Sequence, residues 1–388
     1  MKVKIESSKI VKLSYEDDEA PAVGAALRVQ QARSSWALPR LSSCTGSGPG
    51  RSATGPTGAG RCCSTTRGAR FVEATVDAPM AVSVPSVPSP EVRRLHPRID
   101  DGPVELVQVQ LTRFSCGSLA VGFAGHHQIA DGQATTNFLA AWGLATRRLP
   151  VSPLPVCDRG TRFAPRELPL VEFPHREVKV HRMHLSKDFV ARLKARASSG
   201  LPPSQRGYTT FQSVVAHLWR AITAVRGLGA GVTTKVRISV NGRTRMRPPV
   251  LRDYFGNVVL WAFPRSDAGE LVSRPVAHAA ELIYRAVAEV DDAYFRSFVD
   301  FAAEGETEAD SEQAVLCPDL EVDAWLGINF HGLDFGGGGP FRVMPTYYPM
   351  EGSLFLVPST LGDGGMEAYV ALFDDHLAEF ERICHKIN

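Results

Sequence analysis

One short segment places a histidine, an aspartate and a glycine in an order suited to acid–base chemistry: His127 is followed by Asp131 and Gly132. A neutral imidazole can accept a proton from an attacking nucleophile near pH 7, and a carboxylate one turn away can fix its tautomer. We therefore predict that His127 is a general base. Two other interpretations stay open, because Asp131 is a natural N-cap for a helix and a histidine at a strand end is often structural.

The adjacent His126 raises the question of a metal site. Neighbouring side chains on a strand point to opposite faces of the sheet, so His126, His127 and Asp131 are poorly placed to share one ion. Cys62 and Cys63 have no second pair of cysteines or histidines at zinc-site spacing. We therefore expect no bound metal.

A second candidate segment joins Asp334 and Phe335 to four glycines that include Gly336 and Gly338. A glycine-rich loop is suited to binding phosphate when a helix follows it. The sequence after the glycines does not predict a helix, so a structural turn is the favoured interpretation. The chain has no Gly-x-Ser-x-Gly motif, and a serine-hydrolase arrangement is therefore unsupported.

Three arginines form a basic cluster, Arg243, Arg245 and Arg247. They could stay solvated, contact a phosphate, or supply a partner for Asp131. The residues around them leave these roles open.

The elements that position His127 follow from the spacing of apolar residues. Residues 104–113 and 118–127 alternate as two adjacent strands, which would put His127 at the end of the second strand. Asp131 would then begin a helix with an apolar stripe. Thr209 and Gln212 resemble a capping box that begins another helix. Further predicted elements are a strand over residues 236–240, a buried strand over residues 258–263 and a helix over residues 277–290.

Length, charge and cysteine content bound the class of protein. A chain of 388 residues exceeds what one hydrophobic core usually supports, so we expect two domains. A net charge of +2 does not suggest nucleic acid or a membrane surface as a partner. The sequence contains neither a signal-peptide core nor a run of about 18 apolar residues. Seven cysteines, an odd number, favour free thiols and a cytoplasmic location.

The composition changes between about residues 20 and 68, where glycine, serine, threonine, arginine and proline dominate. Such a stretch buries too little apolar surface to offset its ordering entropy, so we expect it to be disordered or loosely packed. Our favoured explanation is a frame slip in a G/C-rich gene, corrected just before Arg67. Under that hypothesis Trp36, Cys44 and the Cys62–Cys63 pair carry no evolved function.

The motifs together resemble those of the plant BAHD acyltransferase family. The segment from His127 to Gly132 matches the family's His-x-x-x-Asp-Gly motif. The segment that begins at Asp334 matches its Asp-Phe-Gly-Trp-Gly motif, except that Gly337 replaces the tryptophan. Residues 253–257 are similar to its Tyr-Phe-Gly-Asn segment. The occurrence of all three in the family's order makes the resemblance specific.

The resemblance covers residues 1–17 and about 68–388, and it implies a mixed α/β (α+β) fold like that of chloramphenicol acetyltransferase. The implied parts are an N-terminal domain over residues 1–155, a crossover loop over residues 156–181 and a C-terminal domain over residues 182–388. A solvent channel would run between the two domains.

The resemblance also implies a mechanism. His127 would remove a proton from the acceptor as it attacks the thioester of acyl-CoA, a co-substrate and not a bound cofactor, and no acyl-enzyme would form. Asp131 would pair with an arginine, for which Arg243 is our candidate. The Asp334 motif, with Phe335, Gly336 and Gly338, would be mainly structural.

Within the family, residues 345–359 are most similar to enzymes that acylate amines such as agmatine or putrescine. We therefore expect transfer of a hydroxycinnamoyl group to a small amine, in phenolamide biosynthesis, by a monomer. Tyr254, Asn257 and Glu351 are candidate substrate-binding residues, because a carboxylate near the acceptor would attract an ammonium group. The alternatives are an O-acyltransferase acting on an alcohol such as shikimate and a catalytically impaired binding protein.

Overall fold

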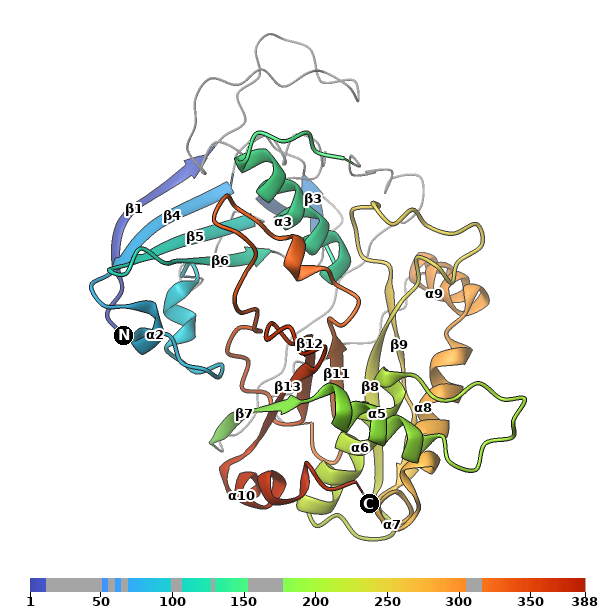
Figure 1. Cartoon of the computed structure of the whole chain (residues 1–388). Helices are drawn as coiled ribbons and strands as arrows, with labels where there is room; N and C mark the ends of the chain where they lie inside the picture. Colours follow the sequence, from blue (N-terminus) through green and yellow to red (C-terminus); the bar gives the residue numbers. More distant parts are fainter. Residues whose placement is uncertain are drawn as a thin grey trace.

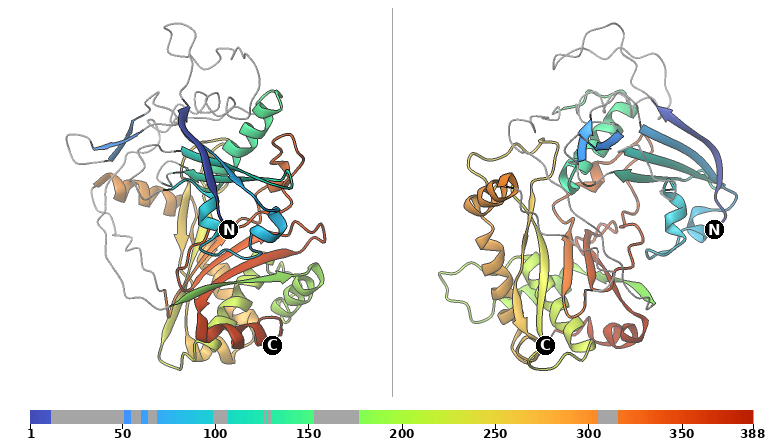
Figure 2. Two further views of the ribbon diagram at one scale, coloured as in Figure 1. Left: turned by 90° about the vertical axis from the view of Figure 1, so that its left-hand side faces the viewer. Right: turned by 180° about the vertical axis from the view of Figure 1, so that it is seen from behind.

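The computed structural model describes residues 1–11, 51–54, 60–63, 69–98, 107–125, 127, 130–152, 177–304 and 316–387. In these ranges the chain forms two large sheets, which lie in separate regions of the molecule with helices packed against each (Figures 1 and 2). This is the mixed α/β architecture expected from the sequence.

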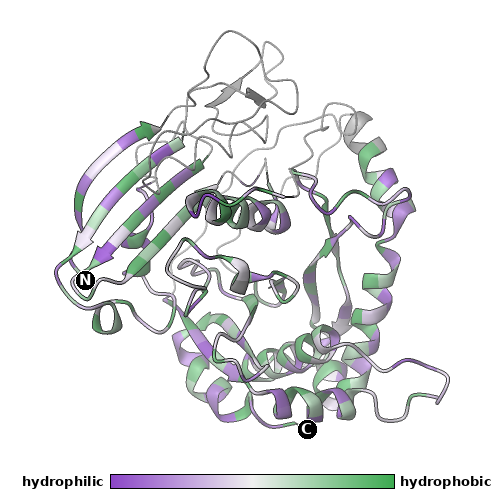
Figure 3. Ribbon diagram, turned by 45° about the horizontal axis from the view of Figure 1, so that its top comes forward, coloured by the Kyte–Doolittle hydropathy of each residue, from purple (hydrophilic) through white to green (hydrophobic). Residues whose placement is uncertain are grey.

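The first sheet holds the strand that leads to His127. Its order is β1 (Lys4–Val11), β4 (Ala69–Val76), β5 (Val107–Phe114) and β6 (Leu119–Gly125). The β4–β5 pair is parallel, and the β1–β4 and β5–β6 pairs are antiparallel. Hydrophobic and hydrophilic residues alternate along these strands (Figure 3), which is typical of a sheet with one covered face. Helix α3 (Gly132–Thr146) covers that face, with Phe138 and Trp142 against Phe71 and Val109.

Short elements surround this sheet. Helices α2 (Met80–Ser83) and η2 (Val92–Leu95) follow β4. Strands β2 (Arg51–Thr54) and β3 (Gly60–Cys63) pair only with each other among the described strands. We expected residues 20–68 to be disordered or loosely packed, and the β2–β3 ribbon is the part of that stretch that the structure describes. The rest of that stretch lies outside the described residues, so the frame slip stays a hypothesis.

The second sheet has seven strands and forms the larger core. The path runs β10 (Arg265–Asp267), β8 (Thr233–Asn241), β11 (Leu320–Ala324), β12 (Ser353–Pro358), β13 (Met366–Phe373) and β7 (Val178–Leu185), and β9 (Val259–Ala262) also pairs with β8. Its helices are α5 (Lys187–Ala197), α6 (Thr210–Val225), α7 (Ala268–Ser273), α8 (Val276–Glu289), α9 (Asp292–Glu304) and α10 (Asp374–Ile383). The predicted capping box is confirmed, because Thr209 and Gln212 hydrogen-bond each other's backbone N–H at the start of α6.

The two faces of the second sheet differ in chemistry. Val236 and Ile238 of β8 and Val322 of β11 are buried in the core that contains residues of α5, α6 and α8. Because side chains alternate along a strand, Arg237, Ser239 and Asp323 lie on the opposite face. We call this the open face of the second sheet.

The predicted domain boundaries are only partly within the described residues. Most of the crossover loop over residues 156–181 lies outside them. Strand β7 begins at Val178 and pairs with β13, so residues 178–181 of the predicted crossover loop form part of the second sheet. No helix in the described ranges is long and apolar enough to cross a bilayer.

One segment of the C-terminal half returns to the first sheet. After β11 the chain passes through η3 (Phe330–Gly332) and places the Asp334 motif on α3. Asp334 accepts a hydrogen bond from Arg147 at 2.9 Å, and the ring of Phe335 meets Trp142 edge-on at 4.9 Å. The backbone N–H groups of Gly336 and Gly338 donate to the Asp334 carboxylate. The motif is therefore a structural turn that docks the second half of the chain on the first.

The close approach of this turn to α3 yields a test. A Cβ atom at Gly143 would lie 2.6 Å from the carbonyl oxygen of Asp334, which neither backbone can tolerate without moving. Although alanine favours helices, we expect Gly143→Ala to lower the free energy of unfolding by about 1–2 kcal/mol, measured by urea unfolding. Gly337→Ala is the matched control, because nothing lies within 4 Å of its Cβ position. Equal stability of the two variants would contradict the docking role.

Candidate active site

A buried ion pair joins the His127 loop to the second sheet. Arg243 donates to Asp131 through Nη1 at 2.7 Å and through Nη2 at 3.1 Å. Both side chains are almost completely buried, at 3% and 2% exposure. A bidentate pair shielded from water is strong and geometrically specific. Of the three roles that the sequence left open for Arg243, the structure shows the pairing with Asp131.

Both oxygens of Asp131 have further donors. Oδ1 accepts the backbone N–H of Ala134, which makes Asp131 the N-cap of α3, and Oδ2 accepts the backbone N–H of Val258. Arg243 also donates to the carbonyl groups of Tyr254 and Gly256. Asp131 is thus both a helix cap and an ion-pair partner. Each of its oxygens accepts two hydrogen bonds, so its contacts fix the loop that carries His127.

His127 lies in an exposed turn just beyond β6. The strand ends at Gly125, so the predicted extension of β6 to His127 is wrong, and strand alternation does not orient its ring. The turn is held from the second half of the chain, because Asn257 donates its side-chain N–H to the carbonyl of His127 at 2.7 Å. An exposed imidazole on a fixed backbone is free to meet a substrate.

Asp323 of β11, which was not among the predicted site residues, lies close enough to His127 for the two side chains to interact electrostatically. Burial raises the pKa of Asp323, while a hydrogen bond with Ser239 and the positive charges of His127 and Arg237 lower it by less. A carboxylate held in a destabilising environment at an open face is typical of a functional site.

A second carboxylate and a cation lie beside Asp323. Glu321, two residues earlier on the same face of β11, is 3.5 Å from Arg237. The guanidinium of Arg237 stacks over the ring of Trp261 at 3.8 Å, which fixes its position. The alternation of Leu320 and Val322 with these two acids was a signal in the sequence that could have found them.

Glu351, predicted to attract the amine, has a different role. Its side chain is fully buried, and its two oxygens accept hydrogen bonds from Nη2 of Arg226 at 2.7 and 2.8 Å. The backbone N–H of Cys317 donates to it as well. A carboxylate sealed from solvent by an arginine cannot receive a substrate, so the prediction for Glu351 does not fit this geometry. Its pair instead ties α6 to the start of β12.

The other two substrate-binding candidates also take part in positioning. Tyr254 is 1% exposed and packs in the core of the second sheet, so its ring does not face a substrate. Asn257 is exposed, but its amide holds the His127 backbone.

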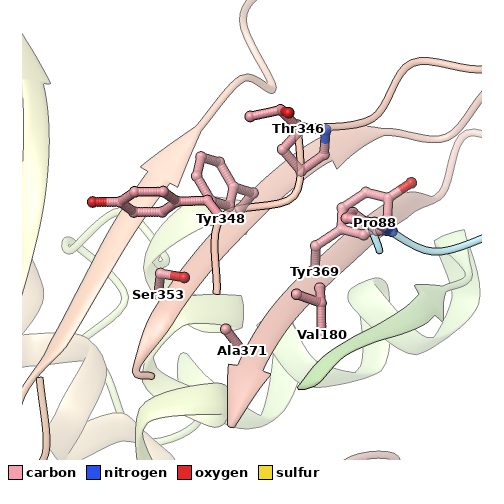
Figure 4. Close-up of a pocket in the computed structure, with 9 residues that line it drawn as sticks. Pro88, Val180, Thr346, Tyr348, Ser353, Tyr369 and Ala371 are labelled. Atoms are coloured by element: carbon pink, nitrogen blue, oxygen red, sulfur yellow. The ribbon is translucent and has the colours of Figure 1, made fainter. Parts of the chain in front are cut away.

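A hollow lies on the open face of the second sheet. Val180, Ser353 and Ala371 form its floor, and the rings of Tyr348, Phe355 and Tyr369 surround it. Figure 4 shows Tyr348 and Tyr369 on two sides of the hollow, with Ser353 and Ala371 below them in the view. It is small and partly open to solvent. We call it the β12–β13 hollow.

The described residues contain no cluster of three or more histidine, cysteine, aspartate or glutamate side chains that could hold a metal ion. The chemistry that this arrangement offers is therefore that of an exposed imidazole, two carboxylates and an aromatic hollow.

Comparison with protein families identifies the family of this chain. The model of the Transferase family, which comprises the BAHD acyltransferases, matches residues 50–386. The chain belongs to this family. This BAHD acyltransferase is 47% identical over 350 residues to agmatine coumaroyltransferase-1 of Hordeum vulgare, an alignment that covers 83% of this chain and 79% of that protein.

A second relative points to the same branch of the family. Putrescine hydroxycinnamoyltransferase of Oryza sativa subsp. japonica is 47% identical over 365 residues, which covers 82% of this chain and 80% of the relative. Among solved structures, vinorine synthase superposes with a TM-score of 0.71 at 21% identity, covering 97% of this BAHD acyltransferase and 96% of that chain. The structural likeness shows the shared fold.

The Asp131–Arg243 pair yields a prediction about stability. Arg243→Ala leaves a buried carboxylate without its cation, and we expect it to lower the free energy of unfolding by about 3–5 kcal/mol, measured by chemical denaturation. Arg247→Ala is the matched control, because the side chain of Arg247 is exposed and its guanidinium donates to the carbonyl of Thr244 at 3.5 Å. A loss below about 1 kcal/mol for Arg243→Ala would show that the pair does not hold the loop.

Proposed function

We propose that this protein transfers an aromatic, hydroxycinnamoyl-type acyl group from acyl-CoA to a small amine, with His127 as general base and without an acyl-enzyme. The observation that carries the proposal is the exposed His127 turn opposite Asp323. Relatives named for agmatine and putrescine as acceptors support it. Cytoplasmic location and a monomeric state stay predictions from the sequence.

The reaction needs one group that takes up a proton and later returns it. The neutral amine attacks the thioester carbonyl, and His127 accepts the N–H proton as the carbon–nitrogen bond forms. The tetrahedral intermediate collapses as the carbon–sulfur bond breaks, and the imidazolium returns the proton to the departing CoA thiolate. One histidine thus serves both steps, and no enzyme nucleophile is required.

The charges on the open face favour an amine over the alternative acceptor. An amine arrives as an ammonium ion, which the carboxylates of Asp323 and Glu321 would attract toward His127, and it releases one proton to solvent before it attacks as the neutral amine. Shikimate carries a carboxylate, which Asp323 would repel. The electrostatics of β11 therefore support the amine acceptor and give no support to the O-acyltransferase alternative.

Replacing His127 tests catalysis directly. With p-coumaroyl-CoA and agmatine or putrescine, we expect His127→Ala to lower kcat by about 100- to 10,000-fold, measured by mass spectrometry of the amide product. Because the side chain of His127 is exposed, the thermal midpoint of the His127→Ala variant should match that of the unsubstituted protein. His385→Ala removes another exposed imidazole and should leave kcat unchanged. Undiminished turnover by folded His127→Ala would rule out its role as the base.

Asp323 gives a prediction about pH. Because burial raises the pKa of Asp323, its carboxylate becomes neutral at a higher pH than an exposed aspartate does, so the KM for the amine should rise as pH falls through that pKa. We expect Asp323→Asn to raise the amine KM about 10-fold near pH 8, equivalent to about 1.4 kcal/mol, and to flatten this pH dependence.

Two controls separate this effect from a loss of folding. A raised carboxyl pKa opposes folding once pH exceeds it, so Asp323→Asn should not lower the thermal midpoint at neutral pH. Asp188→Asn changes a carboxylate on α5, on the helix-covered face, and should leave the amine KM unchanged. An unaltered KM in Asp323→Asn would remove Asp323 from acceptor binding.

A further inference from the structure

The two halves of the chain touch on both sides of the open face of the second sheet. On the β8 side, Arg243 holds Asp131 in the buried bidentate pair. On the β7 side, the side chain of Arg93 donates to the carbonyl of Tyr347 at 3.3 Å, and its guanidinium lies 5.1 Å from the centre of the Tyr347 ring. The hydroxyl of Tyr347 donates to the carbonyl of Val178 in β7 at 3.5 Å. Strands β11, β12 and β13 lie between β8 and β7 in the sheet.

The two contacts differ in strength. Asp131 and Arg243 are both charged and nearly sealed from water, so separating them would leave an unpaired buried charge. Arg93, in contrast, is exposed, and its partners are a neutral carbonyl group and an aromatic ring, so water can replace them. A neighbouring contact is of the same kind, since Arg342 donates to the carbonyl of Pro85 at 3.4 Å. The β7 side is therefore the side on which the two halves can separate.

Tyr347 belongs to a coil over residues 341–350, which leads into β12 and which we call the strap. Its residues Val343 and Met344 pack on the open face, against side chains of β12 and β13. Within the described part of the chain, residues 340–347 form no backbone–backbone hydrogen bond. The strap is thus packed on the second sheet but has few of the backbone bonds that would fix its path.

The link between the strap and the first half has little packing. Asp334 and Phe335 are docked on α3, and the glycines at residues 336–339 lead from them to the strap. All four glycines are exposed, and nothing lies within 4 Å of a Cβ atom built at Gly337 or Gly338. A glycine run without packing changes its dihedral angles at little steric cost. The docked motif can therefore stay on α3 while the strap moves with the second sheet.

We propose that the contact between Arg93 and Tyr347 is a clasp, which opens and closes the β7 side of the open face while the buried ion pair keeps the β8 side joined. The structure shows the clasp closed. Hinge motions of this kind admit ligands to a site between two rigid bodies. The effect on turnover rests on the proposed function, because substrates would pass this opening to reach His127.

Distances between the two halves test the motion without requiring turnover. Spin labels attached through p-acetylphenylalanine in place of Val82 and Leu361, two exposed residues in different halves, avoid the native cysteines. Double electron–electron resonance should show a main distance and a minor longer one, and we expect Arg93→Ala to enrich the longer one about three- to ten-fold. Arg94→Ala is the matched control, because Arg94 is also exposed but donates to the carbonyl of Met1 within the first half.

A second variant covers the case in which Arg93→Ala fails to fold. Tyr347→Ala removes the ring over which Arg93 stacks, and it should enrich the longer distance about two- to five-fold. An unchanged distance distribution in the folded variant would overturn the clasp, and so would an equal change in Arg94→Ala.

Locking the clasp tests its role in turnover. Cysteines introduced together as Arg93→Cys and Tyr347→Cys can be joined by a short, reducible bis-methanethiosulfonate, and mass spectrometry confirms the link. With p-coumaroyl-CoA and agmatine, we expect the joined protein to lose at least about 10-fold in kcat and to regain it with dithiothreitol. The controls are the unsubstituted protein, whose Cys116 and Cys317 are exposed, and Arg93→Cys alone. In both controls the reagent should leave kcat unchanged.

The outcomes separate this inference from the proposed function. If the unsubstituted protein forms no amide but Arg93→Ala enriches the longer distance, the clasp stands and the proposed function fails. If amide forms at the same rate with the clasp locked, the proposed function stands and the role of the clasp in admitting substrates fails.

Discussion

The structure depends on one desolvated ion pair, between Asp131 and Arg243. Burying two charges costs several kcal/mol per ion unless hydrogen bonds replace the lost water. Here Asp131 accepts from Arg243, from the N-terminus of α3 and from Val258, and Arg243 donates to two further carbonyl groups. Because these contacts come from both halves of the chain, their geometry fixes the His127 turn relative to the second sheet.

The carboxylates of this protein divide into two kinds according to their surroundings. Asp131 and Glu351 are buried against arginines that satisfy both oxygens, so they stabilise the fold and are closed to substrates. Asp323 lies on the open face, and burial raises its pKa despite nearby positive charges. Residues in such unfavourable environments are usually retained for function, because the fold alone gains nothing from them. That contrast sets Asp323 apart from the carboxylates that stabilise the fold.

The open face of the second sheet offers two adjacent environments. The β11 strand presents acids, and the neighbouring β12 and β13 strands present an aromatic hollow. Strand pairing holds these environments about one strand spacing apart.

The sequence by itself determined the features that depend on neighbours in the chain. Short-range spacing predicts the helix cap at Asp131, the capping box at Thr209 and the alternating strands. It also gives the motif order that identifies the family. The tertiary structure decided which charges meet. Arg243 donates hydrogen bonds to Asp131, which is 112 residues away in the sequence, while Arg245 donates to carbonyl groups at the end of α8. Glu351 pairs with Arg226, which is 125 residues away in the sequence. Asp323 instead interacts electrostatically with His127. Local spacing specifies backbone hydrogen bonds, but burial and ion pairing depend on packing between distant segments.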